Sequence, residues 1–374
     1  MAIEIGWREG LVYPAMVKGV AAGIVEGRLL VAGGMGYPWR EVEFGFALPT
    51  GQRAEGKAPA RVAGERIDAP LGNWSPLPPL PVGVAWTSGV AAGGGLVVVG
   101  GRRQSADGEV DGIAEVWFFD VAEGGGAWRR LADRPSRASI PTTAADGDHV
   151  YTAFGTSWRP HPEHAVDDLN IYRLDVRSGS GWETVTRFPG KPRWGAAMAV
   201  CGGTLYVIGG HDVPLGGVRE KTGGNAYQER DGRTVLETFS EAWAFDLAGG
   251  GWSRLASPPR AFVAAGFTVA DRWVVLAGGA SWVVDGYGVS VLMQNHVASL
   301  EMVSFSREVW AFDTRSGRWS CLEPLPYGIC SAAAAAEGNR VYLVGNETID
   351  KARSNTFGTV FEGTIRLTGP DDGS

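Results

Sequence analysis

The sequence predicts an all-β protein, a six-bladed β-propeller with four antiparallel strands per blade, on the strength of three observations. A stretch that opens with Trp and closes with Gly-Gly, or a remnant of it, recurs six times in 374 residues. From the Trp to the closing position there are 26 residues in five copies and 27 in the fourth. The composition, with 56 glycines and 20% charged residues, is typical of turn-rich β proteins. The copies open at Trp7, Trp74, Trp128, Trp182, Trp252 and Trp319 and close at Gly33, Gly100, Phe154, Gly209, Gly278 and Gly345.

Each copy divides into four strand-length segments, which are rich in β-branched or aromatic residues and bounded by Gly, Pro, Asp or Ser. In the fourth unit these are 195–201, 205–209, 241–246 and a strand that opens at Trp252. The third of them recurs as EVWFFD at 115–120, LNIYRLD at 169–175 and EVWAFD at 308–313. We expect the six repeated Trp residues to be structural, because each falls at the same point of an outer strand, where a large apolar ring can pack between blades.

The two ends of the chain complete one blade between them. The last unit has strands at 331–336, 340–345 and 359–367 but no Trp strand, and residues 3–8 form a Trp strand with no blade before them. Joining them closes the ring and removes two unpaired sheet edges. We therefore predict a single domain over 1–374. Its blades span approximately 15–78, 82–132, 136–186, 193–256, 260–323, and 328–367 together with 3–8.

The connections between the second and third strands vary in length. The closing position and the next Trp are separated by 41, 28, 28, 43 and 41 residues, so blades one, four and five carry 13 to 15 extra residues. In an up-and-down blade this connection emerges on the same face as the blade-to-blade turn. We expect function on that face, because loops held by a rigid scaffold usually carry it.

Composition excludes some classes of protein. The formal net charge of −7 and the pI of about 5.4 argue against a nucleic-acid partner, which would need a concentrated basic surface. Cys201, Cys321 and Cys330 fit no metal motif and fall in predicted strands, so we expect buried thiols in a reducing compartment. No signal peptide or membrane-spanning run is visible. We expect a cytoplasmic protein with no membrane contact, or a periplasmic one if a leader was removed.

Residues 19–37, GVAAGIVEGRLLVAGGMGY, and the repeated pattern of diglycine, aromatic-x-x-Asp, Trp, Leu and Pro resemble Kelch-type six-bladed propellers over 3–367. The stretch 345–353, GNETIDKAR, followed by FGTVFEGTI, more specifically resembles the sialic acid mutarotases, or N-acetylneuraminate epimerases. In that family a Glu just past the diglycine is followed six residues later by an Arg. Here this blade ends the chain instead of preceding the GVAxG blade, which resembles the cyclically permuted subfamily. Asn346 departs from the second Gly of the family pattern.

The resemblance implies roles for Glu347 and Arg353 as the catalytic pair. Mutarotation opens and recloses a sugar ring, and a carboxylate can take the anomeric hydroxyl proton and return it. An Arg can hold a sugar carboxylate through paired hydrogen bonds. The partner implied is a small acidic sugar, and no cofactor is implied. Without the resemblance, a loop salt bridge of Arg353 with Glu347 or Asp350 is the favoured interpretation of these residues.

Cations and aromatic residues gather in the segments that share this face. A set of cations on an acidic protein suggests an anionic ligand, and aromatic rings suit a sugar. The alternatives are that the Arg residues tie neighbouring blades together and that the aromatic rings pack between loops. Lys18, Arg103, Arg159, Tyr37, Trp86, Trp194 and Trp282 belong to these sets. As substrate-binding residues we select Arg40, Arg102, Arg137, Arg193, Arg260, Trp39, Trp158, Tyr327 and His211.

Other chemistries find little support in the sequence. A copper site of the galactose-oxidase kind needs a Cys cross-linked to a Tyr, but the three cysteines fall in strands, away from the loop tyrosines. His161 and His164 fit a solvated loop better than a metal site, so no metal is expected. No P-loop or dinucleotide fingerprint appears, because no helix follows the diglycines. Two hypotheses remain: a mutarotase or epimerase for an acidic sugar such as N-acetylneuraminate, or a non-catalytic Kelch propeller that binds a protein or a glycan.

Overall fold

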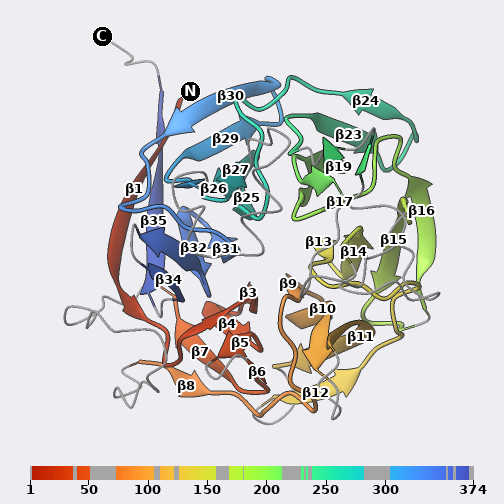
Figure 1. Cartoon of the computed structure of the whole chain (residues 1–374), viewed down its shortest axis with the longest axis vertical. Helices are drawn as coiled ribbons and strands as arrows, with labels where there is room; N and C mark the ends of the chain where they lie inside the picture. The colour runs from red at the N-terminus through yellow and green to blue at the C-terminus, as the bar shows by residue number, and fades with distance from the viewer. Residues whose placement is uncertain are drawn as a thin grey trace.

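Six sheets surround a central axis (Figure 1). The computed structural model describes residues 2–36, 40–50, 73–104, 110–121, 126–156, 168–179, 181–212, 229–230, 233–234, 238–281, 304–350, 353–356 and 359–369. Each of the six sheets has four antiparallel strands, and all the regular elements in these ranges are strands. The predicted six-bladed propeller is therefore confirmed.

The strands of each blade follow one another from the axis outward. The first blade contains β3 (Ala21–Val25), β4 (Arg28–Ala32), β7 (Gly45–Pro49) and β8 (Ser75–Pro76). The second contains β9 (Ser88–Ala92), β10 (Gly95–Gln104), β11 (Val110–Asp120) and β12 (Ala127–Arg130). The third contains β13 (Thr142–Asp146), β14 (His149–Ala153), β15 (Asn170–Asp175) and β16 (Glu183–Arg187). The fourth contains β18 (Ala197–Cys201), β19 (Thr204–Ile208), β23 (Ala242–Asp246) and β24 (Trp252–Arg254). The fifth contains β25 (Gly266–Ala270), β26 (Trp273–Ala277), β29 (Val309–Asp313) and β30 (Arg318–Leu322).

The sixth blade is built from both ends of the chain, as the sequence predicts. It contains β31 (Ala333–Glu337), β32 (Arg340–Val344), β35 (Thr359–Thr368) and β1 (Ala2–Val12). The outermost pair, β1 and β35, lies side by side in Figure 1 and runs antiparallel from Ala2 opposite Thr368 to Val12 opposite Thr359. Ile3 and Ile5 of β1 are buried with residues of the fifth blade. The first strand of the chain therefore seals the ring.

The repeated Trp residues join each blade to the one before it. Five of them donate the indole N–H to a main-chain carbonyl of the preceding blade, while the sixth, Trp74, is buried with its ring edge-on to Tyr13 at 5.1 Å. The five bonds are Trp7 to Glu323 at 3.0 Å, Trp128 to Pro78 at 2.8 Å, Trp182 to Ala132 at 2.9 Å, Trp252 to Arg187 at 3.0 Å and Trp319 to Ala256 at 2.9 Å. Trp74 is buried, and the other five are half-buried with the indole N–H bonded to the preceding blade, so these residues are structural.

The cysteines differ from the expectation in one respect. All three are free, and Cys330 is buried, but Cys201 is only half-buried and Cys321 is exposed. Cys321 lies in the outer strand β30, next to the buried Leu322. Because side chains alternate along a strand, one of these neighbours faces the core and the other faces solvent.

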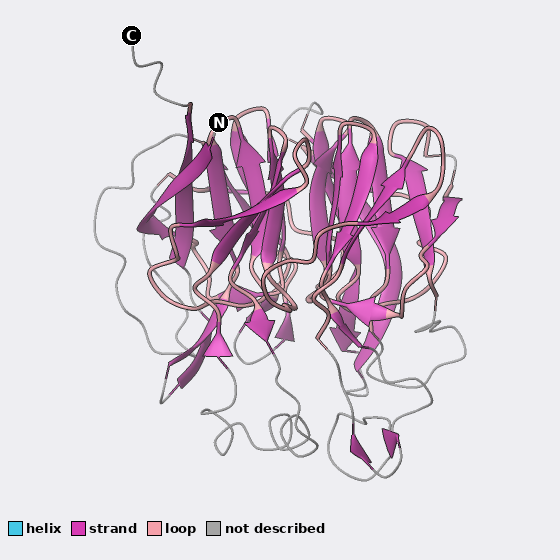
Figure 2. Ribbon diagram, turned by 90° about the horizontal axis from the view of Figure 1, so that it is seen from above, coloured by secondary structure: helices cyan, strands magenta, loops and turns pink. Residues whose placement is uncertain are grey.

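The two faces of the ring differ in what they carry (Figure 2). One bears the short hairpins between first and second strands. The other, which we call the mouth, bears the blade-to-blade turns and the connections between second and third strands, where small sheets form. These are β2 (Val17–Lys18) with β5 (Met35–Gly36) and β6 (Arg40–Glu41); β17 (Arg193–Trp194) with β20 (His211–Asp212); β21 (Glu229–Arg230) with β22 (Arg233–Thr234); β27 (Ala280–Ser281) with β28 (Ser304–Phe305); and β33 (Glu347–Asp350) with β34 (Arg353–Thr356).

Candidate functional site

The same backbone pairing recurs in every blade at the mouth. A residue three positions before the inner strand pairs with the residue two positions after the closing position of the repeat. The pairs are Lys18 with Met35, Ala85 with Arg102, Ser139 with Thr156, Trp194 with His211, Val263 with Ala280, and Cys330 with Glu347. The repeat therefore sets twelve equivalent positions around the axis, and chemistry at the mouth depends on which residues occupy them.

The next residue of each turn is in the left-handed backbone region. The six are Gly19, Trp86, Ile140, Gly195, Ala264 and Ser331, with φ between 51° and 65°. Main-chain hydrogen bonds link several across neighbouring blades: Ile140 N–H to Trp86 O at 2.8 Å, Ala264 N–H to Gly195 O at 2.8 Å and Ser331 N–H to Ala264 O at 2.9 Å. Four of the six are not glycine, and such residues persist in this conformation only where the surroundings hold them there.

A cavity of about 290 Å³ follows the axis of the propeller. The inner strands of all six blades line it, mostly with small residues such as Ala, Gly, Ser and Thr. At the mouth, the turn residues Trp86, Trp194 and Ser331 line it as well. The cavity is small and its walls are rigid strands, so a ligand of sugar size is expected to sit at its mouth rather than deep within it.

Glu347 lies at this mouth, at the start of β33, and is held by residues of two blades. The Lys18 ammonium donates to Oε2 of Glu347 at 2.7 Å, and the Ser331 hydroxyl donates to Oε1 at 3.0 Å. The side chain of Glu347 is 12% exposed, so it is mostly enclosed but still reachable. Asn346, which replaces the second glycine, is fully buried and donates to the carbonyl of Thr359 at 3.0 Å.

Arg353, the predicted partner of Glu347, lies in β34, which pairs with β33. In that pairing the backbone of Arg353 lies opposite Asp350. The side chains of Arg353 and Asp350 lie outside the described ones, so the role of Arg353 stays a prediction. The ion pair that the structure gives Glu347 is with Lys18, whose side chain is 17% exposed. The loop salt bridge considered from the sequence stays a prediction, and the structure adds an ion pair of Glu347 with a cation of the next blade.

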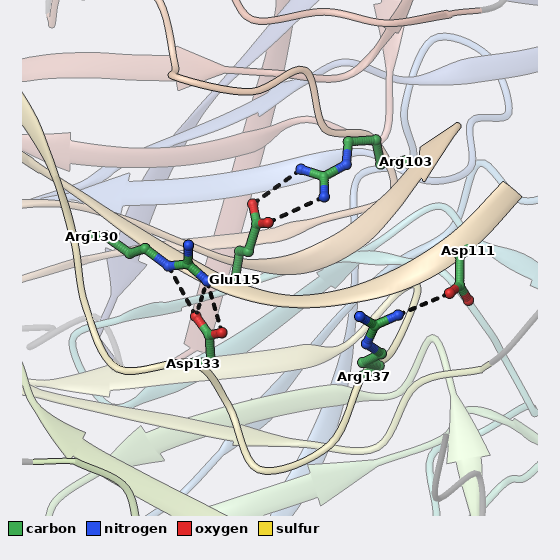
Figure 3. A network of polar contacts seen from close by, with 6 residues as sticks. All are labelled: Arg103, Asp111, Glu115, Arg130, Asp133 and Arg137. Atoms are coloured by element: carbon green, nitrogen blue, oxygen red, sulfur yellow. Dashed lines mark hydrogen bonds and ion pairs between the residues drawn. The ribbon is translucent and has the colours of Figure 1, made fainter. Parts of the chain in front are cut away.

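Several predicted cations at the mouth carry a carboxylate partner. Arg102 pairs with Glu41 at 3.1 Å, Arg137 with Asp111 at 3.0 Å and Arg260 with Glu308 at 3.1 Å. Figure 3 shows the Arg137 pair beside two others, Arg103 with Glu115 and Arg130 with Asp133. The predicted set of cations is thus a set of alternating charges, and Arg102 and Arg137 each tie one blade to the next.

Arg193 departs from its predicted place at the surface of the mouth. Its side chain is 0% exposed, and its guanidinium donates to the carbonyls of Gly209 and Lys191 and to the carboxylate of Glu241. The rings of Phe188 and Phe239 enclose it at 4.5 Å each. Burial alone would raise the pKa of Glu241, but the hydrogen bond and the charge of Arg193 lower it below the ordinary value. Arg193 ties the turn to its blade. It therefore has a structural role, which was the alternative to binding a ligand.

Of the predicted aromatic and His residues, Trp86 and Trp194 line the cavity, whereas His211 and Tyr327 do not. His211 is 2% exposed and its ring lies against that of Trp194, with centroids 5.5 Å apart, so it backs the indole instead of facing the cavity. Tyr327 is half-buried and packs edge-on against Phe361 at 5.0 Å. Trp39, Trp158, His161, His164 and the side chain of Arg40 lie outside the described residues.

The described part of the mouth has a charged side and an apolar side. Lys18, Arg102, Glu41 and Glu347 come from blades six, one and two and form the charged side. Next to Glu347, the buried residues Val263, Ala280 and Cys330 form a cluster that extends to the fifth blade, and Trp194, Ala264 and Phe305 pack against it. Burial, reinforced by Glu347, raises the pKa of Cys330 to about 12, so its thiol stays neutral. Such a mouth suits a ligand with an acidic group on one side and an uncharged surface on the other.

Sequence reasoning missed Ser331 and Glu41 and gave Lys18 no specific role. The predicted ring closure could have indicated the role of Lys18. It makes the sixth blade the neighbour of the first, so a turn residue of the first blade can reach Glu347. Within the described ranges, no three side chains of His, Cys, Asp or Glu gather closely enough to hold a metal ion. Among the same residues, no helix is long and apolar enough to cross a membrane.

The chain is similar to curated proteins named N-acetylneuraminate epimerase, although no protein-family model matches it. The relative from Yersinia pestis (strain Pestoides F) is 29% identical over 197 residues, which cover 48% of this chain and 46% of the relative. The relative from Pasteurella multocida is 24% identical over 305 residues, covering 69% and 73%. The Yersinia match thus spans about half the length of the relative. These matches confirm the resemblance stated from the sequence.

One solved structure, described as the structure of YjhT, has the same fold along nearly the whole chain. It superposes with a TM-score of 0.66 and covers 97% of this chain and 98% of its own, at 16% sequence identity. At that identity the likeness concerns the architecture alone. It shows that the arrangement of blades described above is one that a known protein adopts.

Proposed function

We propose that this protein interconverts the anomers of an acidic sugar such as N-acetylneuraminate, with Glu347 as the acid–base group. The observation that carries the proposal is the position of Glu347. Its carboxylate lies on the mouth face, mostly enclosed between the ammonium of Lys18 and the hydroxyl of Ser331, and Ser331 lines the axial cavity. The names of the curated relatives support the same assignment.

The chemistry needs few parts. To open the ring, a base takes the proton of the anomeric hydroxyl, the bond from the anomeric carbon to the ring oxygen breaks, and the ring oxygen gains a proton. Reclosure on the other face of the resulting carbonyl gives the other anomer, so no atoms or electrons are gained or lost. Glu347 is the group that takes the first proton and returns it, while water or a second side chain serves the ring oxygen.

The two sides of the mouth suit the two sides of such a sugar. The guanidinium of Arg102 offers charge-assisted hydrogen bonds to a sugar carboxylate. Away from it, Trp194 lines the cavity, and the ring of His211 supports the indole from behind. An indole of this kind can pack on the uncharged face of a sugar ring. We therefore expect the sugar to bind with its carboxylate toward blades one and two.

The test is the rate of anomer exchange of N-acetylneuraminate, measured by NMR with purified protein. Glu347→Gln keeps the size of the side chain but removes its basicity, so exchange is expected to slow by about 100-fold or more. Thermal unfolding of the variant serves as the control for folding. The proposal fails if wild type exchanges no faster than buffer, or if Glu347→Gln exchanges as fast as wild type. Saturable binding of the sugar without exchange would favour the non-catalytic alternative.

A further inference from the structure

One ion pair at the mouth exists because the ring is closed. Lys18 lies in the turn that enters the first blade and Glu347 follows the second strand of the sixth, 329 residues later in the chain. Their charged atoms are 2.7 Å apart, and their side chains are 17% and 12% exposed. Water screens a pair this enclosed less than it screens surface charges, so each group has a larger influence on the other.

Glu347 is fixed at its main chain and at both carboxylate oxygens. Its backbone N–H donates to Cys330 O at 3.0 Å, and its carbonyl accepts from Cys330 N–H at 2.9 Å. Oε1 accepts from the Ser331 hydroxyl, and Oε2 accepts from Lys18. Because each carboxylate oxygen can accept two hydrogen bonds, a substrate hydroxyl can still bind to either of them.

Lys18 is itself held in place by a residue of the second blade. Its ammonium lies 5.3 Å from the centre of the Trp86 ring, a distance at which the ring attracts a cation. Gly19 allows this approach: it has a φ of 65°, and a Cβ at that position would lie 2.8 Å from the main-chain nitrogen of Trp86. The ammonium therefore rests between an indole of the second blade and a carboxylate of the sixth.

We propose that Lys18 is the positioning residue for Glu347 in anomer exchange, an inference that rests on the function proposed above. The ammonium holds the carboxylate in one orientation at the mouth of the cavity and stabilises its charge until the anomeric proton arrives. Lys18 keeps its own proton throughout, while Glu347 gains the proton of the anomeric hydroxyl and then releases it. Lys18 acts through Glu347, so its contribution vanishes when Glu347 can no longer act as a base.

A double-mutant cycle of exchange rates tests this dependence, with Lys18→Met, Glu347→Gln and the double variant compared to wild type. Lys18→Met removes the charge and keeps the apolar stem, and it is expected to slow exchange about tenfold or more in wild type. In Glu347→Gln it is expected to slow the residual exchange by less than about twofold. Lys18→Arg, which keeps a charge, is expected to exchange faster than Lys18→Met.

Arg177→Met is the matched control, because Arg177 forms an exposed ion pair with Asp148 on the opposite face of the ring. It is expected to leave the exchange rate unchanged. Equal slowing by Lys18→Met in wild type and in Glu347→Gln would overturn the inference. If wild type exchanges no faster than buffer, the proposed function fails. Thermal unfolding of wild type, Lys18→Met, Glu347→Gln and the double variant then tests whether Lys18 holds Glu347. Additive shifts in Tm would overturn the inference, and non-additive shifts would support the positioning of Glu347 by Lys18.

Discussion

The two faces of the ring satisfy their charges in different ways. On the hairpin face, Asp175 accepts from the N–H groups of Arg177 at 2.8 Å and Ser178 at 3.1 Å, so its partners are two and three residues away. At the mouth, Lys18 and Glu347 are 329 residues apart, and Arg102 and Glu41 are 61 apart. The hairpin face also has contacts between blades, such as the hydrogen bond from the Thr50 hydroxyl to Glu337 at 2.6 Å, but its Asp turns are local. The charged side of the mouth, by contrast, depends on the assembled ring.

The local turns explain a sequence motif. Asp175, Asp246 and Asp313 each end the third strand of a blade, and each accepts a hydrogen bond from the N–H group two residues later. The N–H of Ser178 and then that of Arg177 lower the pKa of Asp175, and the N–H groups of Gly249 and Ala248 lower that of Asp246. The aromatic-x-x-Asp motif thus builds a turn and needs no contact with another blade.

Arg193 offers the strongest way to break the comparison, because it is a mouth residue whose carboxylate partner, Glu241, belongs to its own blade. Arg193→Met leaves the Glu241 carboxylate and the carbonyl of Gly209 without their buried donor. We expect the free energy of unfolding to fall by about 3–5 kcal/mol, measured by urea denaturation. Arg254→Met is the matched control: Arg254 binds the other oxygen of Glu241 but is 65% exposed, so a loss below about 1 kcal/mol is expected. Equal losses in the two variants would contradict this assignment.

Asp313 tests the hairpin face. It accepts from Arg315 N–H and the Ser316 hydroxyl at 3.0 Å each and from Arg272 at 3.2 Å. Burial alone would raise the pKa of Asp313, but these donors lower it below the ordinary value. Its contribution to stability is therefore present above the ordinary carboxyl range and is lost as the pH falls through the lowered pKa.

Asp313→Asn is thus expected to lower the free energy of unfolding by about 1–3 kcal/mol at pH 7. The gap between variant and wild type is expected to narrow as the pH falls below about 4, because wild type then loses the same charge. Urea denaturation at a series of pH values measures both effects. A gap that widens toward acid pH would show that Asp313 is not stabilised as an anion. Sugar exchange per folded molecule is expected to stay unchanged.

The smallest effect is expected at the repeated Trp residues. Trp319→Phe removes the donor to Ala256 O but keeps an aromatic ring beside Phe312, whose centroid lies 5.0 Å away. One neutral hydrogen bond contributes about 1 kcal/mol, so a loss of that order is expected in thermal unfolding. A loss several times larger would mean that the indole fills space between the blades that a phenyl ring cannot fill.

The fold could be predicted from the sequence because the same four-strand pattern recurs six times. Constant spacing fixes the blades, and two incomplete ends imply one shared blade. The position of Glu347 follows from the same register, as the sixth equivalent of Met35 and Arg102. The partners of a turn side chain do not follow. Arg193 is equivalent to Val17, and both are buried, but the sequence does not show that Arg193 binds Glu241. Nor does it show that Lys18 binds a carboxylate of the neighbouring blade.

The closing strand also determines when the mouth comes into being. Residues 2–12 pair with residues 359–368, so the outer strands of the sixth blade come from segments far apart in the sequence. Contacts of such separation form late, because the chain between them must first be ordered. Lys18 and Glu347 meet across the same junction. Proposed catalysis therefore requires the sixth blade, and a nascent chain from which residues 333–368 have not yet emerged has the strands of five blades but no assembled acid–base site.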